Sequence, residues 1–388
     1  MTLNVDEAAH SARVVQLISQ RIGAAGGFLS FETFMELALY APGLGYYSAG
    51  SAKLGAAGDF TTAPEMSDLF ARCVARQCAQ VLDGIPGGSI LELGAGTGRM
   101  AAALLAELAV LGRLPARYDI LEVSADLAER QRAHLATLPE ALRSRVRWLQ
   151  RLPDTGLRGV ILANEVLDAL PCRRFVIRGA PPSMIEELGV TLNPDGTLAW
   201  ATRAADAALT SAVQELHAQL PEPLPPGYAS EVCLLADPWI TSLAAPLTQG
   251  AMLLFDYGLP RAQYYHPERR SGTLTCHFKH RAHFDPLIQV GVQDITAWVD
   301  FTRVALAGHA AGLTVLGFCT QAGFLLGAGI DEFLAQAHSP IEQARLAGEA
   351  RRLLMPGEMG EAFKLLALGR GVDAPLLSFT HQDLRDSL

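Results

Sequence analysis

The sequence is poor in positive charge. Its 388 residues include 31 lysines and arginines against 40 aspartates and glutamates, which gives a formal net charge of −9 and a pI of about 5.6. A surface that binds nucleic acid carries an excess of lysine and arginine, because it must neutralise phosphates. We therefore expect no nucleic-acid partner, whereas a cationic substrate is compatible with this charge.

The sequence also lacks paired cysteines and a targeting segment. None of its six cysteines belongs to a C-x-x-C pair, which is typical of reduced thiols in a cytosolic protein. The first residues, Met-Thr-Leu-Asn-Val-Asp-Glu, include neither a basic stretch followed by an apolar one nor an arginine-rich stretch. We therefore expect a cytoplasmic location.

No stretch of the chain is convincing as a membrane span. Residues 304–330 hold no Asp, Glu, Lys or Arg, but six glycines interrupt them, together with His309 and Gln321. A membrane helix needs about 20 consecutive, mainly apolar residues. The segment divides better into a helix that ends at Gly312, a strand at residues 313–318 and a second helix, so we expect no membrane span.

The most informative stretch of the chain is residues 90–98, Ile-Leu-Glu-Leu-Gly-Ala-Gly-Thr-Gly. An apolar run leads into alternate glycines, and an Ala/Leu-rich segment follows at residues 100–111. This pattern predicts a strand, a tight turn and a helix. Glycines allow the backbone to approach a ligand closely, and the N-terminus of the helix offers free N–H groups.

A second predicted strand, residues 118–123, carries Glu122, which lies 24 positions after Gly98 (122 − 98). A carboxylate about 20 residues after a glycine loop is well placed to bind ribose hydroxyls. The pattern therefore gives these candidate cofactor-binding residues: Glu92, Gly94, Ala95, Gly96, Gly98, Glu122 and Val123.

Three interpretations of the glycine loop are open. Dinucleotide-binding enzymes need G-x-G-x-x-G, and here Arg99 stands at the third glycine position. The spacing G-x-G-x-G behind Glu92-Leu93 instead resembles motif I of class I S-adenosylmethionine-dependent methyltransferases. The third interpretation is a glycine-rich turn without a ligand.

Strands and helices alternate along most of the chain, which indicates an α/β fold with a doubly wound, Rossmann-like parallel sheet. We predict seven core strands, at residues 88–93, 118–123, 145–149, 159–163, 251–256, 313–318 and 363–368. We predict helices at residues 6–22, 31–40 and 65–82, with Ser30 as the N-cap of the second. Residues 171–249 interrupt the alternation, with hairpin strands at 174–178 and 184–200.

These patterns divide the chain into four parts. Residues 1–82 form a helical N-terminal region with a cofactor flap, and residues 83–170 and 250–370 form the core. Residues 171–249 form an inserted, β-containing substrate or lid subdomain, and residues 371–388 form a C-terminal tail.

Catalytic candidates follow the fourth predicted strand, because ligands of open α/β sheets bind beyond the carboxyl ends of the strands. Asn164, Glu165 and Asp168 stand there. In a methyltransferase this is the position that aligns the nucleophile with the methyl group, and a carboxylate can hold a guanidinium in a bidentate way. The structural alternative is that Glu165 and Asp168 cap the following helix.

The loop before the third predicted helix is a further candidate. Its sequence is Gly-Asp-Phe-Thr-Thr-Ala-Pro-Glu at residues 58–65. Thr62 and Pro64 fit the first positions of a helix, and the loop also suits a flap over a cofactor. The flap interpretation adds these candidate cofactor-binding residues: Asp59, Thr61, Thr62, Pro64 and Glu65.

One cluster has the residue types of a zinc site, namely Cys276, His277, His280 and His283. Lys279 and Arg281 stand among these residues and repel a cation. We therefore predict a basic substrate loop and no metal site.

Taken together, these blocks resemble the MidA-like methyltransferases, which include the mitochondrial assembly factor for respiratory complex I and bacterial relatives. The resemblance extends from about residue 30 to residue 370. It rests on residues 34–47, 58–65, 92–98, 164–171, 256–258, 294–301 and 359–364. The blocks at 58–65 and 164–171 are far more specific than the glycine loop.

This resemblance implies a class I methyltransferase fold with S-adenosyl-L-methionine as cofactor. It implies arginine methylation of a protein substrate, to symmetric dimethylarginine, with a respiratory complex I subunit as target. It gives Glu165 the role of holding the guanidinium and residues 59–65 the role of closing over the cofactor. Asn164 stands where the pattern of the family has a histidine, and the double-glutamate loop of better-known arginine methyltransferases is missing.

Two other functions remain open from the sequence. One is methylation of oxygen or nitrogen in a small molecule, for which residues 171–249 would shape the pocket. The other is a non-catalytic assembly chaperone that retains the cofactor fold. The sequence also leaves open whether the chain works as a monomer or as a homodimer.

Overall fold

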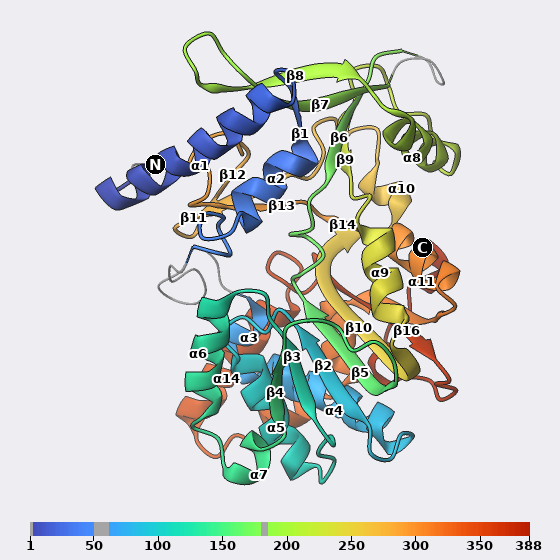
Figure 1. The fold of residues 1–388 in the computed structure, drawn as a ribbon. Helices are drawn as coiled ribbons and strands as arrows, with labels where there is room; N and C mark the ends of the chain where they lie inside the picture. The colour runs from blue at the N-terminus through green and yellow to red at the C-terminus, as the bar shows by residue number, and fades with distance from the viewer. Residues whose placement is uncertain (1–2, 50–61, 180–184) are drawn as a thin grey trace.

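The computed structural model describes residues 3–49, 62–179 and 185–388. Figure 1 shows two lobes, with a large sheet in the lower lobe and a smaller sheet in the upper one. The larger sheet has the strand order β15-β16-β10-β5-β2-β3-β4. The bounds of these strands in chain order are β2 Ser89–Leu93, β3 Tyr118–Leu121, β4 Val146–Leu149, β5 Leu157–Asn164, β10 Leu247–Leu259, β15 Thr314–Thr320 and β16 Phe363–Arg370.

This sheet contains all seven predicted core strands. Neighbours from β10 to β4 run parallel, whereas β16 is antiparallel to both β10 and β15. A further strand, β14 (Val299–Asp300), pairs with β10, so the sheet has eight strands and the predicted count of seven is wrong by one. A strand of two residues is too short to produce a period-two pattern in the sequence.

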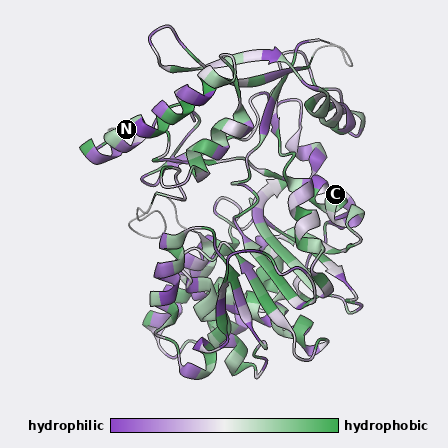
Figure 2. Cartoon of the chain, in the orientation of Figure 1, coloured by the Kyte–Doolittle hydropathy of each residue, from purple (hydrophilic) through white to green (hydrophobic). Residues whose placement is uncertain are grey.

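Helices cover both faces of the large sheet. Along β2, Ile90 belongs to the hydrophobic cluster that includes α4 (Asp68–Asp83), α5 (Arg99–Val110) and α14 (Pro340–Leu354). Leu91 belongs to the cluster that includes α9 (Ala236–Ala244) and α11 (Phe301–Ala310). Successive side chains of a strand point to opposite faces, so apolar residues at both positions require cover on both sides. The strands of this sheet accordingly form the apolar centre of the lower lobe in Figure 2.

The predicted helix at residues 65–82 is broken in the structure. A short helix, α3 (Ala63–Met66), ends at Ser67, and α4 begins with Ser67 as its N-cap. The Ser67 hydroxyl accepts a hydrogen bond from the backbone N–H of Leu69 and donates one to Glu349 Oε2 at 2.6 Å. Serine favours a helix start over a helix interior because its hydroxyl competes for backbone hydrogen bonds.

The upper lobe combines the N-terminal region with the insert. Strand β1 (Leu29–Ser30) pairs with β7 (Ile185–Leu192), which also pairs with β6 (Arg173–Ile177) and β8 (Leu198–Ala204). Strand β9 (Ala229–Val232) completes this sheet beside β6. Helices α1 (Val5–Ala24) and α2 (Phe31–Tyr40) share one hydrophobic cluster with β7 and β8. Ser30 caps α2 through the backbone N–H of Thr33, as predicted.

A third, small sheet has the order β12-β11-β13, with β11 at Thr275–Phe278, β12 at Arg281–His283 and β13 at Asp294–Thr296. The remaining elements are α6 Ala125–Leu135, α7 Glu140–Arg143, α8 Ala207–Ala218, α10 Arg261–Tyr264, α12 Gln321–Gly327, α13 Ile330–Ala335 and the 3₁₀ turns Leu377–Phe379 and Arg385–Ser387. Within the described residues, no helix is both long enough and apolar enough to cross a bilayer.

Candidate active site

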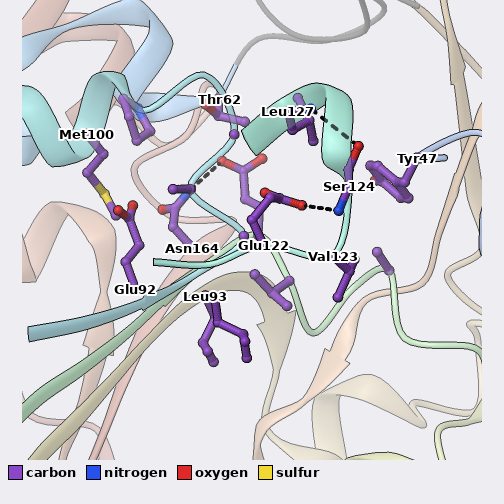
Figure 3. A pocket seen from close by; sticks show the side chains of 18 of the residues that line it. Tyr47, Thr62, Glu92, Leu93, Met100, Glu122, Val123, Ser124, Leu127 and Asn164 are labelled. Atoms are coloured by element: carbon purple, nitrogen blue, oxygen red, sulfur yellow. Dashed lines mark hydrogen bonds between the residues drawn. The ribbon is translucent and has the colours of Figure 1, made fainter. Parts of the chain in front are cut away.

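The main candidate for a ligand site is a cavity of about 310 Å³ at the carboxyl ends of β2, β3 and β5. From β2 the chain continues to β3 on one side, and β5 lies on the other side. Such a reversal of strand order opens a crevice in which α/β proteins bind ligands. Tyr40 and Tyr47 of the upper lobe also line the cavity, and Figure 3 shows its interior.

The predicted glycine loop forms one wall of this cavity. Gly94, Gly96 and Gly98 have φ angles of +61°, +55° and +83°, a conformation that side chains with a Cβ rarely adopt. Gly94, Ala95 and Gly96 line the cavity, whereas Gly98 occupies the N-cap position of α5. The loop therefore lines the cavity at the start of a helix, and the predicted order of strand, turn and helix is confirmed.

Glu122 lies at the carboxyl end of β3 and is held in place from two sides. Its carboxylate accepts hydrogen bonds from the backbone N–H of Ser124 at 2.8 Å and from Gln131 Nε2 at 2.9 Å (Figure 3 shows the first). Gln131 Nε2 also donates to the carbonyl of Gly96 at 3.0 Å, and Gln131 Oε1 accepts from Trp148 Nε1. Burial raises the pKa of Glu122. A single buried amide thus connects the carboxylate to the glycine loop.

Val123 and Glu92 also line the cavity. Val123 is 83% exposed although it is apolar, and it faces the cavity beside Glu122. Glu92 of β2 accepts a hydrogen bond from the Tyr118 hydroxyl at 2.8 Å, and burial raises its pKa to about 7. Glu122 thus lies next to an uncovered apolar side chain, and Glu92 adds a second, fully buried carboxyl group to the cavity.

The described part of the predicted flap also reaches the cavity. Thr62, Pro64 and Glu65 line it, while Asp59 and Thr61 lie outside the described residues. Thr97 donates a hydrogen bond to the Glu65 carboxylate, and Arg99 Nη1 donates to the Glu65 carbonyl at 2.7 Å. Thr62 stands at the N-cap of α3, but its side chain makes no capping bond. These residues therefore attach the start of α3 to the glycine loop.

Asn164 and Glu165 lie where β5 ends, and both line the cavity. Asn164 Nδ2 donates to Glu165 Oε1 at 3.1 Å (Figure 3). Glu165 has a φ of +54°, which is unfavourable for a residue with a long side chain and costs about 1–3 kcal/mol. Strain of this kind is retained where the surrounding structure enforces it, often at functional sites.

Asp256 enforces this turn. Its Oδ2 atom accepts the backbone N–H groups of Leu167 at 2.9 Å and Asp168 at 3.2 Å, and the N–H of Glu165 donates to the carbonyl of Phe255 at 2.9 Å. Asp256 is fully buried within β10, next to Phe255, which pairs with Asn164 of β5. The turn that carries Glu165 is therefore fixed by the neighbouring strand.

The local charges favour the neutral form of the Glu165 carboxyl. Burial raises its pKa to about 8, and the nearby carboxyl of Asp168 adds to the shift. An unpaired carboxylate here would be poorly solvated and would be repelled by its neighbour. A cation bound in the cavity would reverse this preference.

Asp168, the third catalytic candidate, is placed differently. It is buried, does not line the large cavity, and accepts a hydrogen bond from the Tyr257 hydroxyl at 2.5 Å. Its Oδ1 atom has no hydrogen-bond partner among the described residues, and Asp168 lines a separate cavity of about 30 Å³. Burial raises its pKa to about 6. Asp168 can therefore act on a ligand in the large cavity only through Glu165 and the turn between them.

Several cavity residues were not among the candidates proposed from the sequence. Tyr40 and Tyr47 line it from the N-terminal region, and Trp239, Ser242 and Leu243 line it from α9 within the predicted insert. The two tyrosines belong to a distinctive block of sequence, so their position could have been suspected. Helix α9 carries no motif, and only the tertiary structure places it at the site.

The cysteine and histidine cluster forms the hairpin of β11 and β12. Cys276 is buried opposite His283, whereas His280 lies in the turn with a φ of +59°. Lys279 Nζ lies 2.7 Å from Glu7 Oε1 of α1. In the part of the chain that the structure describes, no group of three or more His, Cys, Asp or Glu residues is arranged to hold a metal ion.

The cavity fits a nucleoside ligand with a positive charge. The glycine loop leaves space where a Cβ would intrude; one added to Gly94 would meet Val166 Cγ2 at 3.3 Å. Glu122 offers acceptors for ribose hydroxyls, and the uncovered Val123 offers a surface for a flat base. S-adenosyl-L-methionine combines these parts with a sulfonium cation, which suits a cavity rich in carboxylates.

Comparison with known proteins agrees with this geometry. The family described as "Putative S-adenosyl-L-methionine-dependent methyltransferase" matches residues 73–319. Proteins named mitochondrial protein arginine methyltransferase NDUFAF7 are similar over most of their length. The Danio rerio protein is 27% identical over 383 residues (89% of this chain and 84% of the relative), and the Mus musculus protein is 29% identical over 380 residues (88% and 81%).

A solved structure is more similar still. It is that of a COG1565 superfamily member from Burkholderia thailandensis, crystallised with S-adenosyl-homocysteine bound. It superposes with a TM-score of 0.93 at 39% identity and covers 100% of both chains. The chain therefore belongs to this S-adenosyl-L-methionine-dependent methyltransferase family, and S-adenosyl-L-methionine is its cofactor.

Proposed function

We propose that the protein methylates arginine side chains of a protein substrate. The observation that carries this proposal is the charge of the cavity. Its lining includes Glu65, Glu92, Glu122 and Glu165 and, within the described residues, no lysine, arginine or histidine. Such a cavity attracts a cationic acceptor and repels an anionic one.

Three carboxyl groups in or near the cavity accept hydrogen bonds from tyrosines. Tyr118 donates to Glu92, Tyr257 donates to Asp168, and Tyr47 donates to Asp294 at 2.9 Å. A phenol satisfies a carboxylate as a hydrogen-bond donor but does not neutralise its charge. A cationic acceptor that binds beside these carboxyl groups would therefore favour their ionised forms over the neutral forms that burial favours.

Glu165 is the residue best suited to an arginine. A carboxylate can receive two parallel N–H bonds from a guanidinium, which fixes the plane of that group as well as its position. Guanidinium has a pKa above about 12, so it needs help to lose a proton as it becomes a nucleophile. A pKa of about 8 makes Glu165 a stronger base than an ordinary carboxylate.

The cofactor supplies an electrophilic methyl group bonded to a sulfonium sulfur. In the proposed reaction Glu165 orients a guanidinium nitrogen, whose electron pair forms the new N–C bond while the C–S pair remains on sulfur. The proton released from that nitrogen passes to the Glu165 carboxylate and then to solvent. Asn164 keeps Oε1 of Glu165 in place, and the Asp256-bound turn maintains the position of the backbone.

The names of the relatives support a protein as the acceptor. The NDUFAF7 proteins are protein arginine methyltransferases, and this chain matches more than four fifths of the Danio rerio relative (84%). We further propose a respiratory complex I subunit as the target, following the family resemblance in the sequence. The cytoplasmic location and the homodimer remain predictions.

The test is methyl transfer from radiolabelled S-adenosyl-L-methionine into a lysate of the source organism, followed by hydrolysis of the labelled proteins. We expect label in methylarginine with the wild type and its loss with Glu165→Gln. Glu358→Gln is the matched control, since Glu358 is exposed and lies outside the cavity.

The other outcomes point to other functions. Label only in low-molecular-weight products would indicate a small-molecule methyltransferase. Stable capture of a respiratory subunit by both wild type and Glu165→Gln, without methyl transfer, would indicate an assembly chaperone. Label in methylarginine that persists in Glu165→Gln would contradict the role assigned to Glu165.

A further inference from the structure

Two aromatic side chains, Tyr40 and Tyr47, line the cavity and take no part in the cofactor contacts described above. Tyr40 ends α2, and Tyr47 follows in the turn after it. Their rings are stacked, with centroids 5.5 Å apart and an interplanar angle of 23°. Tyr46 packs edge-on against Tyr47 with centroids 5.1 Å apart, which supports the pair from behind.

The hydroxyl groups of these tyrosines bond to the surrounding protein and hold the rings in place. Tyr40 donates to the carbonyl of Ala169 at 2.9 Å, and Tyr47 donates to Asp294 Oδ1 at 2.9 Å. Burial raises the pKa of both phenols, so both stay neutral donors. The aromatic surface is what this pair offers to a ligand.

The pair lies close to Glu165. Ala169, which accepts from Tyr40, lines the same cavity and belongs to the turn that follows Glu165. Asp294, which accepts from Tyr47, is near enough to raise the pKa of Glu165 by its charge. A carboxyl group and a stacked aromatic pair thus line the same cavity and are connected through Ala169 and Asp294.

We propose that Tyr40, Tyr47 and Glu165 form an acceptor subsite for a flat cation, a guanidinium group. This proposal rests on the proposed function and adds the contacts that select the acceptor. A guanidinium can lie against an aromatic face with its charge over the ring while its edge reaches a carboxylate. An ammonium group carries the charge but is neither flat nor able to form two parallel bonds.

Three small probes distinguish the effect of a flat shape on binding from the effect of a positive charge. Each is an N-acetyl methylamide: that of arginine is flat and cationic, that of lysine is cationic but not flat, and that of citrulline is flat but neutral. We would titrate each into protein saturated with S-adenosyl-homocysteine and follow binding by saturation-transfer NMR. The subsite predicts that the arginine amide binds more tightly than the other two.

Substitutions at Tyr47 then test the ring itself. Tyr47→Ala should weaken the arginine amide by about 2- to 30-fold, the range of a cation–aromatic contact, and leave S-adenosyl-homocysteine affinity unchanged within about twofold. Tyr47→Phe retains the ring and should retain most of the affinity. Phe284→Ala removes an aromatic ring that is 78% exposed and lies outside the cavity, so it serves as the control.

Several results would overturn this assignment. They are equal binding of the three amides, no binding of the arginine amide up to its solubility limit, and unchanged binding in Tyr47→Ala of normal thermal stability. A parallel loss of S-adenosyl-homocysteine affinity would instead place Tyr47 at the cofactor. Failure of the proposed function is separate, because it would appear as absence of methylarginine in the lysate even if the subsite selects guanidinium.

Discussion

The two lobes contribute to the site in different ways. The large sheet supplies the glycine loop, Glu122 and Glu165 at the ends of adjacent strands, and each is recognisable in the sequence. The upper lobe supplies Tyr40 and Tyr47 from the N-terminal region, on a core that β1 shares with β7 of the insert. The difference indicates that the site residues of the large sheet are encoded locally, whereas the position of Tyr40 and Tyr47, the aromatic part of the proposed acceptor subsite, depends on contacts between distant parts of the chain.

We expect the largest effect from a substitution at Glu165, which the large sheet supplies. Glu165→Gln keeps the size of the side chain but removes the base, so kcat should fall by about 10²- to 10⁴-fold. S-adenosyl-homocysteine affinity, measured by calorimetry, should change by less than about threefold if Glu165 belongs to the acceptor. A comparable loss of cofactor affinity would show that the residue serves the cofactor instead.

A substitution at Glu122 should weaken cofactor binding without affecting acceptor binding. Glu122→Ala removes a charged acceptor for ribose hydroxyls and should weaken S-adenosyl-homocysteine by about 10- to 100-fold, as expected for hydrogen bonds to a charged group. The acceptor KM at saturating cofactor should change little. An unaltered calorimetric Kd would contradict the place of Glu122 in the cofactor site.

The pH dependence of acceptor binding should distinguish the role of Glu165 from that of the cofactor-binding residues. The pKa of Glu165 is raised to about 8 in the empty cavity, so its carboxyl is mainly neutral below that pH. A cationic acceptor prefers the ionised form, so its affinity should rise up to about tenfold per pH unit towards pH 8 and level off above it. Glu165→Gln should abolish this rise, which titration of the arginine amide at several pH values can check.

We expect the smallest effect on cofactor affinity from a substitution in the core of the upper lobe. Met35→Ala and Leu253→Ala each truncate a fully buried side chain, in the upper and the lower core respectively. Both should lower the free energy of unfolding by about 2–5 kcal/mol. Only Leu253→Ala should also weaken S-adenosyl-homocysteine, because β10 supports the sheet that carries the cofactor site; equal weakening by both variants would mean that the lobes act as one unit.

The same division explains what could be predicted from the sequence. Residues 90–98 and Glu122 were recognisable because strand, turn and helix signals lie within about 35 residues of each other, and chemistry that is local in sequence leaves local patterns. Glu165 could be proposed from its place after a strand. The burial of Asp168 could not, because it depends on Tyr257 and Asp256 of a strand almost 90 positions further on.

Short and distant pairings escaped prediction for a related reason. Strands β1 and β14 have two residues each and exist only because longer strands lie beside them. The break at Ser67 depends in part on Glu349, 282 positions away, which accepts from the serine hydroxyl. The sequence pattern there is equally compatible with one continuous helix.

The buried amide of Gln131 has a consequence for how the cofactor site tolerates change. Its nitrogen donates to Glu122 and Gly96 while its oxygen accepts from Trp148, so only one orientation of the amide satisfies all three partners. Replacing that nitrogen with oxygen, as Gln131→Glu does, would put two acceptors against each other at the ribose position with almost no change in shape. If Glu122 binds the ribose as we expect, the affinity for the nucleoside therefore depends on the identity of one atom of Gln131, which does not line the cavity.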